Sequence, residues 1–120
     1  MNQILVVDDN STILRMLSFI LERNHYGVMT VDNGTAALEQ LQNHTFDLAI
    51  IDLAMPDMNG LTLLTHVRAD PALNQLPIIM LTASGSDQDR VIARQSGANA
   101  FLTKPTSSRE LLETVSKLLG

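Results

Sequence analysis

Five short apolar runs alternate with segments of helical periodicity along this sequence, and this alternation limits the fold more than any other feature. The runs are rich in β-branched residues and show no polar alternation, which predicts strands that are buried on both faces of a parallel sheet. They cover residues 4–7, 28–31, 48–51, 78–81 and 100–102. Such a sheet must carry helices on both of its faces.

The segments that follow these runs repeat apolar residues at three- and four-residue spacing, which predicts helices. The expected helices cover residues 11–24, 35–42, 61–69, 87–96 and 108–119. Asn10 or Ser11 is the expected N-cap of the first helix. The helix over 87–96 has Val91 and Ile92 as nearly its only large apolar residues, so we expect it to be thinly anchored and able to move.

Strand and helix therefore alternate through the whole chain, and connections of this length between parallel strands form right-handed crossovers. The expected fold is α/β: a doubly wound, five-stranded parallel sheet in the order 2-1-3-4-5, the flavodoxin-like (βα)5 three-layer sandwich. We expect one domain over residues 1–120, because a chain of this length has room for a single core. Ligands of this fold bind beyond the carboxyl ends of the strands, where strands 1 and 3 meet.

Composition and charge exclude several classes of function. The chain has no cysteine, so disulfides, thiolate zinc sites and cysteine nucleophiles are excluded. The formal net charge is −5 and the eight Lys and Arg residues are scattered, which argues against direct binding to nucleic acid. The first apolar run is too short for a signal peptide or a membrane span. We therefore expect a cytoplasmic protein that binds neither nucleic acid nor membranes directly.

Residues suited to a binding site follow four of the five predicted strands. Asp8 and Asp9 come after the first strand, Asp52 after the third, Thr82 after the fourth and Lys104 after the fifth. Each of them alone is explained by ordinary turn or N-cap chemistry. Together, at one edge of the sheet, they predict converging carboxylates that bind Mg²⁺, with a lysine and a hydroxyl group placed to contact an anion beside Asp52.

Four segments at these strand ends combine into one pattern. They are Val-Val-Asp-Asp-Asn at 6–10, Asp-Leu-Ala-Met-Pro-Asp-Met-Asn-Gly at 52–60, Leu-Thr-Ala at 81–83 and Thr-Lys-Pro at 103–105. In this combination the chain resembles the receiver domain of two-component response regulators, in particular the single receivers of the chemotaxis-regulator kind. The resemblance extends from the first strand to the last helix.

This resemblance implies that Asp52 is the phosphoacceptor, taking a phosphoryl group from a phosphohistidine of a sensor histidine kinase or histidine phosphotransfer protein. It implies that Asp8, Asp9, Asp52 and the backbone carbonyl of Ala54 hold Mg²⁺ or Mn²⁺. Lys104 is expected to contact the phosphoryl oxygens. The domain is then not an enzyme in the usual sense, since it catalyses only its own phosphorylation and dephosphorylation.

The resemblance also implies a switch. Thr82 is expected to turn toward the phosphoryl group, and Phe101 matches the aromatic position that turns inward with it. Pro105 is expected to follow a cis peptide bond, and Gly60 to shape the start of a helix. Phosphorylation would then change the surface formed by the fourth helix (87–96), the fifth strand (100–102) and the fifth helix (108–119). This surface is expected to bind a downstream protein target or effector domain.

Three other functions fit parts of this pattern. An FMN-binding flavodoxin needs a Ser-, Thr- and Gly-rich phosphate loop after strand 1, where this chain has acids. A haloacid-dehalogenase-like phosphatase needs a second acid at position 54 and a longer chain. A degenerate receiver that binds partners without phosphorylation stays open, although the residues that such proteins lose are present here.

Two features bear on rate and docking. Neither Ala54 nor Ser84 offers an acid or amide to position a hydrolytic water, so we expect no accelerated dephosphorylation. For Phe19 and Ile20 we favour burial over a place in a kinase-docking face.

Overall fold

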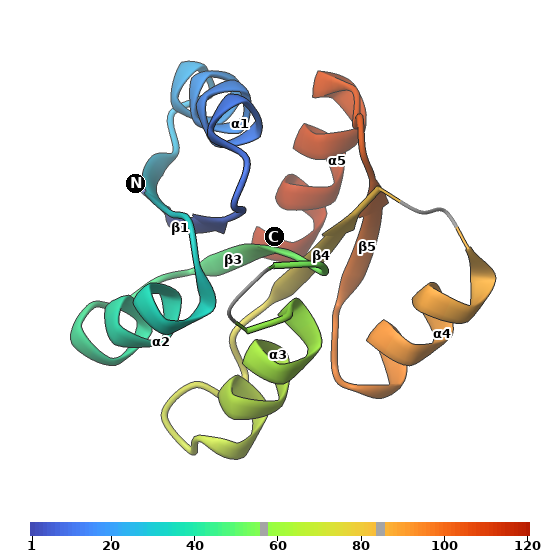
Figure 1. Cartoon of the computed structure of the whole chain (residues 1–120). Coiled ribbons are helices and arrows are strands. Elements are labelled where there is room, and N and C mark those ends of the chain that lie inside the picture. Colours follow the sequence, from blue (N-terminus) through green and yellow to red (C-terminus); the bar gives the residue numbers. More distant parts are fainter. Residues whose placement is uncertain (56–57, 84–85) are drawn as a thin grey trace.

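The five strands form one parallel sheet in the order β2-β1-β3-β4-β5, as predicted. The structure is a computed structural model, and it describes residues 1–55, 58–83 and 86–120 (Figure 1). The strands are β1 (Gln3–Val7), β2 (Gly27–Val31), β3 (Leu48–Asp52), β4 (Ile78–Thr82) and β5 (Ala100–Thr103). The helices are α1 (Ser11–Arg23), α2 (Gly34–Asn43), α3 (Gly60–Ala69), α4 (Asp87–Gln95) and α5 (Ser108–Leu119).

The helices cover both faces of the sheet and make the predicted three layers. In Figure 1, α1 and α5 lie on one side and α2, α3 and α4 on the other. Because successive side chains of a strand point to opposite faces, Ile4 and Val6 pack in the core under α1 and α5, whereas Leu5 and Val7 pack in the core under the other helices. The fold prediction is confirmed.

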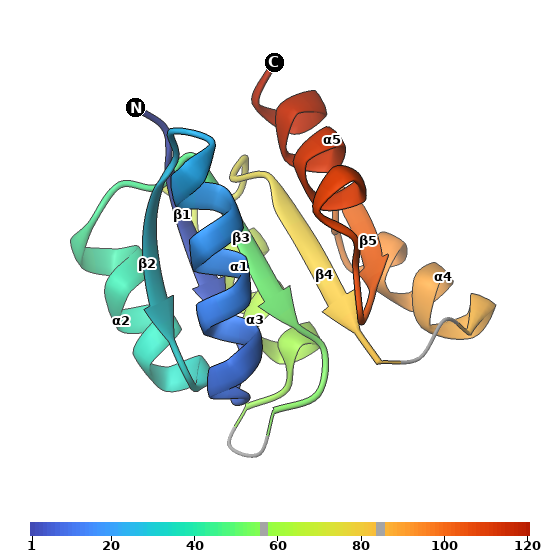
Figure 2. The same ribbon diagram turned by 90° about the horizontal axis from the view of Figure 1, so that it is seen from above.

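The strand register brings the ends of β1 and β3 together. Val7 of β1 lies opposite Val31 of β2 on one side and Ile51 of β3 on the other. The strand arrows in Figure 2 all point the same way, and both chain termini lie at the end from which the strands start. The residues that follow Val7 and Ile51 therefore share one edge of the sheet, at the carboxyl ends of the strands.

The predicted burial is wrong for β2. Met29 is half-buried and Thr30 is exposed, because β2 is one of the two edge strands and has a partner on one side only. An apolar run shows that a segment forms a strand but not where in the sheet it lies. Burial was also wrong for Phe19, whose side chain is 62% exposed on α1.

Helices α4 and α5 both lie next to β5 but are anchored differently. In α5, Leu111 and Val115 are fully buried. In α4 the small Ala93 is the buried residue, while Val91 and Ile92 are exposed. The expectation of a thinly anchored fourth helix is confirmed.

Arg68 of α3 binds the segment that follows the C-terminal end of α4. Its guanidinium donates to the carbonyl of Gly97 from Nε at 3.0 Å and from Nη2 at 2.8 Å. It also donates to the carbonyls of Leu76 and Asn74 and to Oδ1 of Asn99. Asn99 Oδ1 in turn accepts from the N–H of Ile78, the first residue of β4. The segment between α4 and β5 is thereby bound to α3 and to the start of β4, at the amino end of the sheet.

No helix in the described parts of the chain is long and apolar enough to cross a membrane.

Candidate functional site

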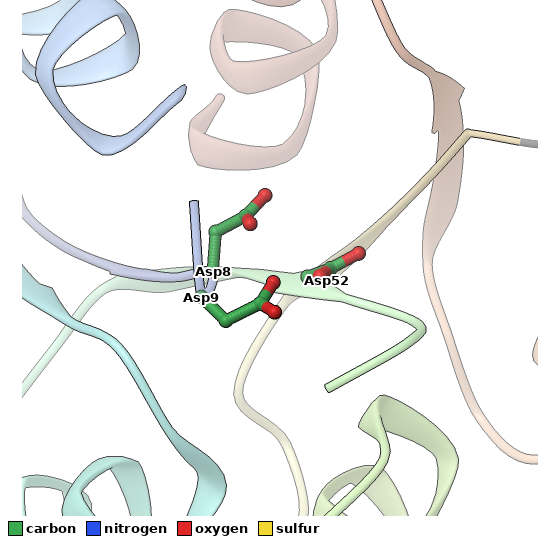
Figure 3. Close-up of side chains that lie close together, drawn as sticks. All are labelled: Asp8, Asp9 and Asp52. Carbon is green, nitrogen blue, oxygen red and sulfur yellow. The ribbon is translucent and has the colours of Figure 1, made fainter. Parts of the chain in front are cut away.

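Three carboxylates converge at the carboxyl ends of β1 and β3. Asp8 and Asp9 follow β1, and Asp52 is the last residue of β3 (Figure 3). One oxygen from each lies within 4.8 Å of the others. Asp8 and Asp52 are buried, whereas Asp9 is exposed. Like charges at this spacing repel one another strongly, so the cluster needs a cation.

Lys104, directly after β5, supplies a positive charge. Its Nζ lies 2.7 Å from Oδ2 of Asp8 and 3.2 Å from Oδ1 of Asp52. The Lys104 N–H donates to the carbonyl of Thr82, which ties the loop after β5 to the end of β4. The structure thus places Lys104 beside Asp52, as predicted, and adds a contact with Asp8 that the sequence did not suggest.

Local turns hold the two buried acids in place. Asp8 Oδ1 accepts from the N–H of Asn10 at 2.9 Å. Asn10 is itself the N-cap of α1, since its side chain accepts from the N–H groups of Thr12 and Ile13. Asp52 Oδ1 accepts a longer bond of 3.4 Å from the N–H of Ala54. The carboxylates are therefore oriented by the backbone that follows each strand.

The site holds charge at an energetic cost. Burial raises the pKa of Asp52 from 3.8 to about 6, and the negative charge of Asp8 adds to the rise, while Lys104 and the Ala54 N–H oppose it. For Lys104, burial alone lowers the pKa, but the hydrogen bond and charge of Asp8, together with those of Asp52, outweigh it and leave the pKa raised. A second cation would relieve the remaining repulsion between the acids.

The donor set fits a hard divalent cation. Apart from the ion pair with Lys104, the buried Oδ2 of Asp8 has no hydrogen-bond partner in the described parts of the chain. Carboxylate oxygens, one of them exposed to solvent on Asp9, are the ligands that Mg²⁺ prefers, together with water. The predicted metal cluster of Asp8, Asp9 and Asp52 is therefore assembled in space.

The remaining predicted residues surround this cluster. Thr82 is buried at the end of β4, and Phe101 is half-buried in β5. Gly60 packs so closely on the backbone of Asp52 that a Cβ there would collide with it. The peptide bond between Lys104 and Pro105 is cis, as predicted. Ser84 lies outside the described residues, as do Pro56 and Asp57 of the 52–60 segment.

A pocket of about 570 Å³ opens over the acids. Asp52, Ala54, Thr82 and Lys104 line it, together with Asp9 and Asn10. Asp89, in the first turn of α4, lines it as well. Sequence analysis missed this residue, because it belongs to a helix rather than to a strand end and because no sequence signal places the first turn of α4 over the site.

Comparison with known proteins agrees with this geometry. Residues 4–116 match the model of the response regulator receiver domain. The chain is 37% identical over 119 residues to the transcriptional regulatory protein CpxR homolog of Haemophilus influenzae, covering 99% of this chain and 51% of that protein. It is 38% identical over 118 residues to the transcriptional regulatory protein SrrA of Staphylococcus aureus, covering 98% and 48%. The chain thus spans about half the length of these curated relatives.

Solved structures agree as well. A putative response regulator from Chloroflexus aurantiacus superposes with a TM-score of 0.95 at 36% identity, over 98% of this chain and 97% of that one. The chemotaxis response regulator CheY4 of Vibrio cholerae superposes with a TM-score of 0.94 at 34% identity, over 99% of both chains. The chain belongs to the family of response regulator receiver domains, the signalling domains of two-component systems.

Proposed function

We propose that residues 1–120 form a phosphoacceptor domain in which Asp52 takes a phosphoryl group from a phosphohistidine of a sensor histidine kinase or histidine phosphotransfer protein. The observation that carries this proposal is the convergence of Asp8, Asp9 and Asp52 at one edge of the sheet, with Lys104 contacting the two buried acids. Receiver-family membership supplies the donor class.

The transfer is a displacement at phosphorus. Oδ1 of Asp52 is engaged by Lys104 and by the N–H of Ala54, so we assign bond formation to Oδ2. A lone pair of Oδ2 forms the new P–O bond while the P–N bond to the donor imidazole breaks, and the imidazole leaves with that electron pair. The products are an acyl phosphate on Asp52 and a histidine that takes a proton from solvent.

The neighbouring residues stabilise the charge that develops. Asp8, Asp9, Asp52 and the carbonyl of Ala54 would hold Mg²⁺ or Mn²⁺, which neutralises charge on the phosphoryl oxygens when it is bound. We propose that Lys104 donates to a phosphoryl oxygen, and its distance of 3.2 Å from Nζ to Oδ1 of Asp52 supports this role. Phosphoryl transfer needs positioning and charge neutralisation above all, and these residues provide both.

The output of the domain is a change of surface. Thr82 lines the pocket beside Asp52, and its neighbour across the strand pair is Thr103, two residues beyond Phe101. We propose that Thr82 turns toward the phosphoryl group, that Phe101 turns inward, and that the surface of α4, β5 and α5 then binds a downstream protein or effector domain. We propose no accelerated dephosphorylation, because Ala54 has no side chain able to position water.

Intact-mass measurement after incubation with acetyl phosphate and Mg²⁺ tests the proposal. We expect a phosphoryl adduct that disappears in Asp52→Asn and in EDTA. Asp32→Asn is the matched control, because Asp32 directly follows β2 at the same edge of the sheet but lies outside the acid cluster. Decay of the adduct within seconds would contradict the slow dephosphorylation.

The same experiment distinguishes the phosphoacceptor domain from the alternative, a degenerate receiver that binds partners without phosphorylation. If neither acetyl phosphate nor a phosphorylated histidine phosphotransfer protein gives an adduct, and Mg²⁺ does not bind, the domain is a phosphate-independent interaction module. An adduct that persists in Asp52→Asn would place the acceptor at another residue.

A further inference from the structure

The first turn of α4 contacts both the candidate phosphoacceptor site and the predicted switch residue. Asp89 is half-buried and lines the pocket over Asp52. Arg90, the next residue, places its guanidinium carbon 5.3 Å from the centre of the Phe101 ring, which is within the range of a cation–π contact. One helical turn therefore connects the pocket with the aromatic side chain of β5.

The two ends of α4 are held with different strength. At the C-terminal end, Arg68 donates two hydrogen bonds to the carbonyl of Gly97, just beyond the helix. At the N-terminal end, the side chain of Ser86 caps the helix by accepting from the N–H of Asp89. Between them, Ala93 is the helix's buried residue. A force applied near Asp89 thus acts on an element that is fixed at its far end and has little apolar anchorage.

Phosphorylation of Asp52 would apply such a force. The acceptor carboxylate loses its single negative charge when it becomes an acyl phosphate, while the phosphoryl group brings about −1.5 to −2. The net gain is between about half and one negative charge, moved outward into the pocket that Asp89 lines. Asp89 also offsets the positive end of the α4 dipole, so the new charge faces a carboxylate rather than a bare helix N-terminus.

We propose that Asp89 and Arg90 release the Phe101 ring from its cation–π contact when Asp52 is phosphorylated. This inference rests on phosphorylation of Asp52. Repulsion between the phosphoryl group and Asp89 moves the first turn of α4 away from the pocket, and Arg90 leaves the ring of Phe101 with it. The ring is then free to change its position. Asp89 and Arg90 are positioning residues in this device and take no part in the chemistry.

Fluorine NMR of protein labelled with fluorophenylalanine tests this release. The chain has three phenylalanines, so each signal is assigned with one Phe→Leu variant. Arg90→Met removes the cation from the ring and should move the Phe101 signal without phosphorylation. In the parent protein, acetyl phosphate and Mg²⁺ should move the Phe101 signal in the same direction. Arg15→Met, on α1 at the opposite face of the sheet, is the control and should leave the signal in place.

The decisive variant is Asp89→Asn, compared with the parent at equal phosphoryl occupancy measured by intact mass. We expect its phosphorylation-dependent shift of the Phe101 signal to fall below half of the parent value. Asp87→Asn removes the same charge from the same helical turn but lies outside the pocket, so it should keep the full shift.

Each result decides one point. A full shift in Asp89→Asn, or an equal loss in Asp87→Asn, overturns the release mechanism while leaving phosphorylation of Asp52 intact. Absence of a phosphoryl adduct in the parent with both acetyl phosphate and a phosphorylated histidine phosphotransfer protein overturns the proposed function, and the release mechanism with it.

Discussion

The two ends of the sheet each hold a partly buried basic side chain, and the two are paired in opposite ways. At the amino end, Arg68 is surrounded by carbonyl oxygens and an amide oxygen, all of which accept its hydrogen bonds. At the carboxyl end, Lys104 is shared between two buried acids, and a third acid lies close by. Burial lowers the pKa of Arg68, yet an arginine stays charged across the physiological range.

The difference shows which cluster stabilises the fold and which stores unfavourable energy. In the Arg68 cluster, the guanidinium donates to oxygen atoms of residues 74–76 and 97–99 that would otherwise lack these hydrogen bonds. The Asp8, Asp52 and Lys104 cluster has more negative than positive charge, and the pKa of Asp52 is raised first by its burial and then by the charge of Asp8. Ligand binding can relieve the second cluster but has nothing to add to the first.

The largest expected effect comes from breaking the amino-end cluster. Arg68→Met keeps most of the apolar stem but leaves the carbonyls of Gly97 and Leu76 without their donor. We expect the free energy of unfolding to fall by about 2 to 4 kcal/mol. Urea denaturation measures it, with Arg94→Met as the control on an exposed arginine. A loss below about 0.5 kcal/mol would show that water replaces the guanidinium without cost.

Substitution in the carboxyl-end cluster should raise the free energy of unfolding instead of lowering it. In EDTA at pH 7.5, Asp52→Asn removes an acid whose charged form the fold disfavours. From the rise of the pKa to about 6, we expect the free energy of unfolding to increase by about 2 to 3 kcal/mol. Urea denaturation in EDTA measures this change.

The same variant has a pH signature. An acid with a raised pKa binds more protons in the folded state, so its contribution to stability is present at low pH and is lost as the pH rises from about 4 to about 6. The advantage of Asp52→Asn should therefore shrink at pH 4.5. An advantage that does not change between pH 4.5 and 7.5 would rule out ionisation of Asp52 as its cause.

Mg²⁺ should relieve the repulsion within the carboxyl-end cluster and so raise the free energy of unfolding. At ten times its dissociation constant, a ligand that binds only the folded protein adds about 1.4 kcal/mol to the free energy of unfolding. We expect this gain in the parent and in Asp32→Asn but not in Asp9→Asn at the same Mg²⁺ concentration. Thermal melts with and without EDTA measure it, and equal gains in all three proteins would place the ion elsewhere.

The smallest effect is expected at the surface, where neither kind of cluster exists. Arg109 and Glu113 form an exposed pair one turn apart on α5, with Nε and Oε1 3.1 Å apart. We expect Arg109→Gln to change the free energy of unfolding by about 0.3 to 0.5 kcal/mol at most. A larger change in urea denaturation would mean that α5 depends on its surface charges as well as on Leu111 and Val115.

The sequence predicted the carboxyl-end cluster better than the amino-end one. Asp8 and Asp52 directly follow apolar runs, and Lys104 comes two residues after one, so strand order alone brings them together. Arg68 contacts the backbone carbonyl of Gly97, 29 positions away. Every residue has such a carbonyl, so no local pattern reveals this partner. The contact between Lys104 and Asp8 escaped prediction for a related reason, since topology places side chains at an edge but does not choose between two acids.

The bounds of an element were predicted well where the local sequence marks its ends, and less well where pairing with a distant segment sets them. The predicted range 108–119 agrees with α5, where an amphipathic stripe and a capping serine mark both ends. By contrast, β1 begins one residue early, at Gln3, because that residue pairs with Gly27 and donates to Asp47. Pairing of this kind depends on a distant chain segment and leaves no mark in the local sequence.

The ion pair between Asp8 and Lys104 joins the first strand of the chain to the loop after the last one. Contacts between such distant segments form late in folding, because the loop they close is long. A chain that is still being synthesised, or one that has lost β5, has its acids without this lysine. On the proposed function, competence to accept a phosphoryl group should therefore appear only once the whole domain has folded.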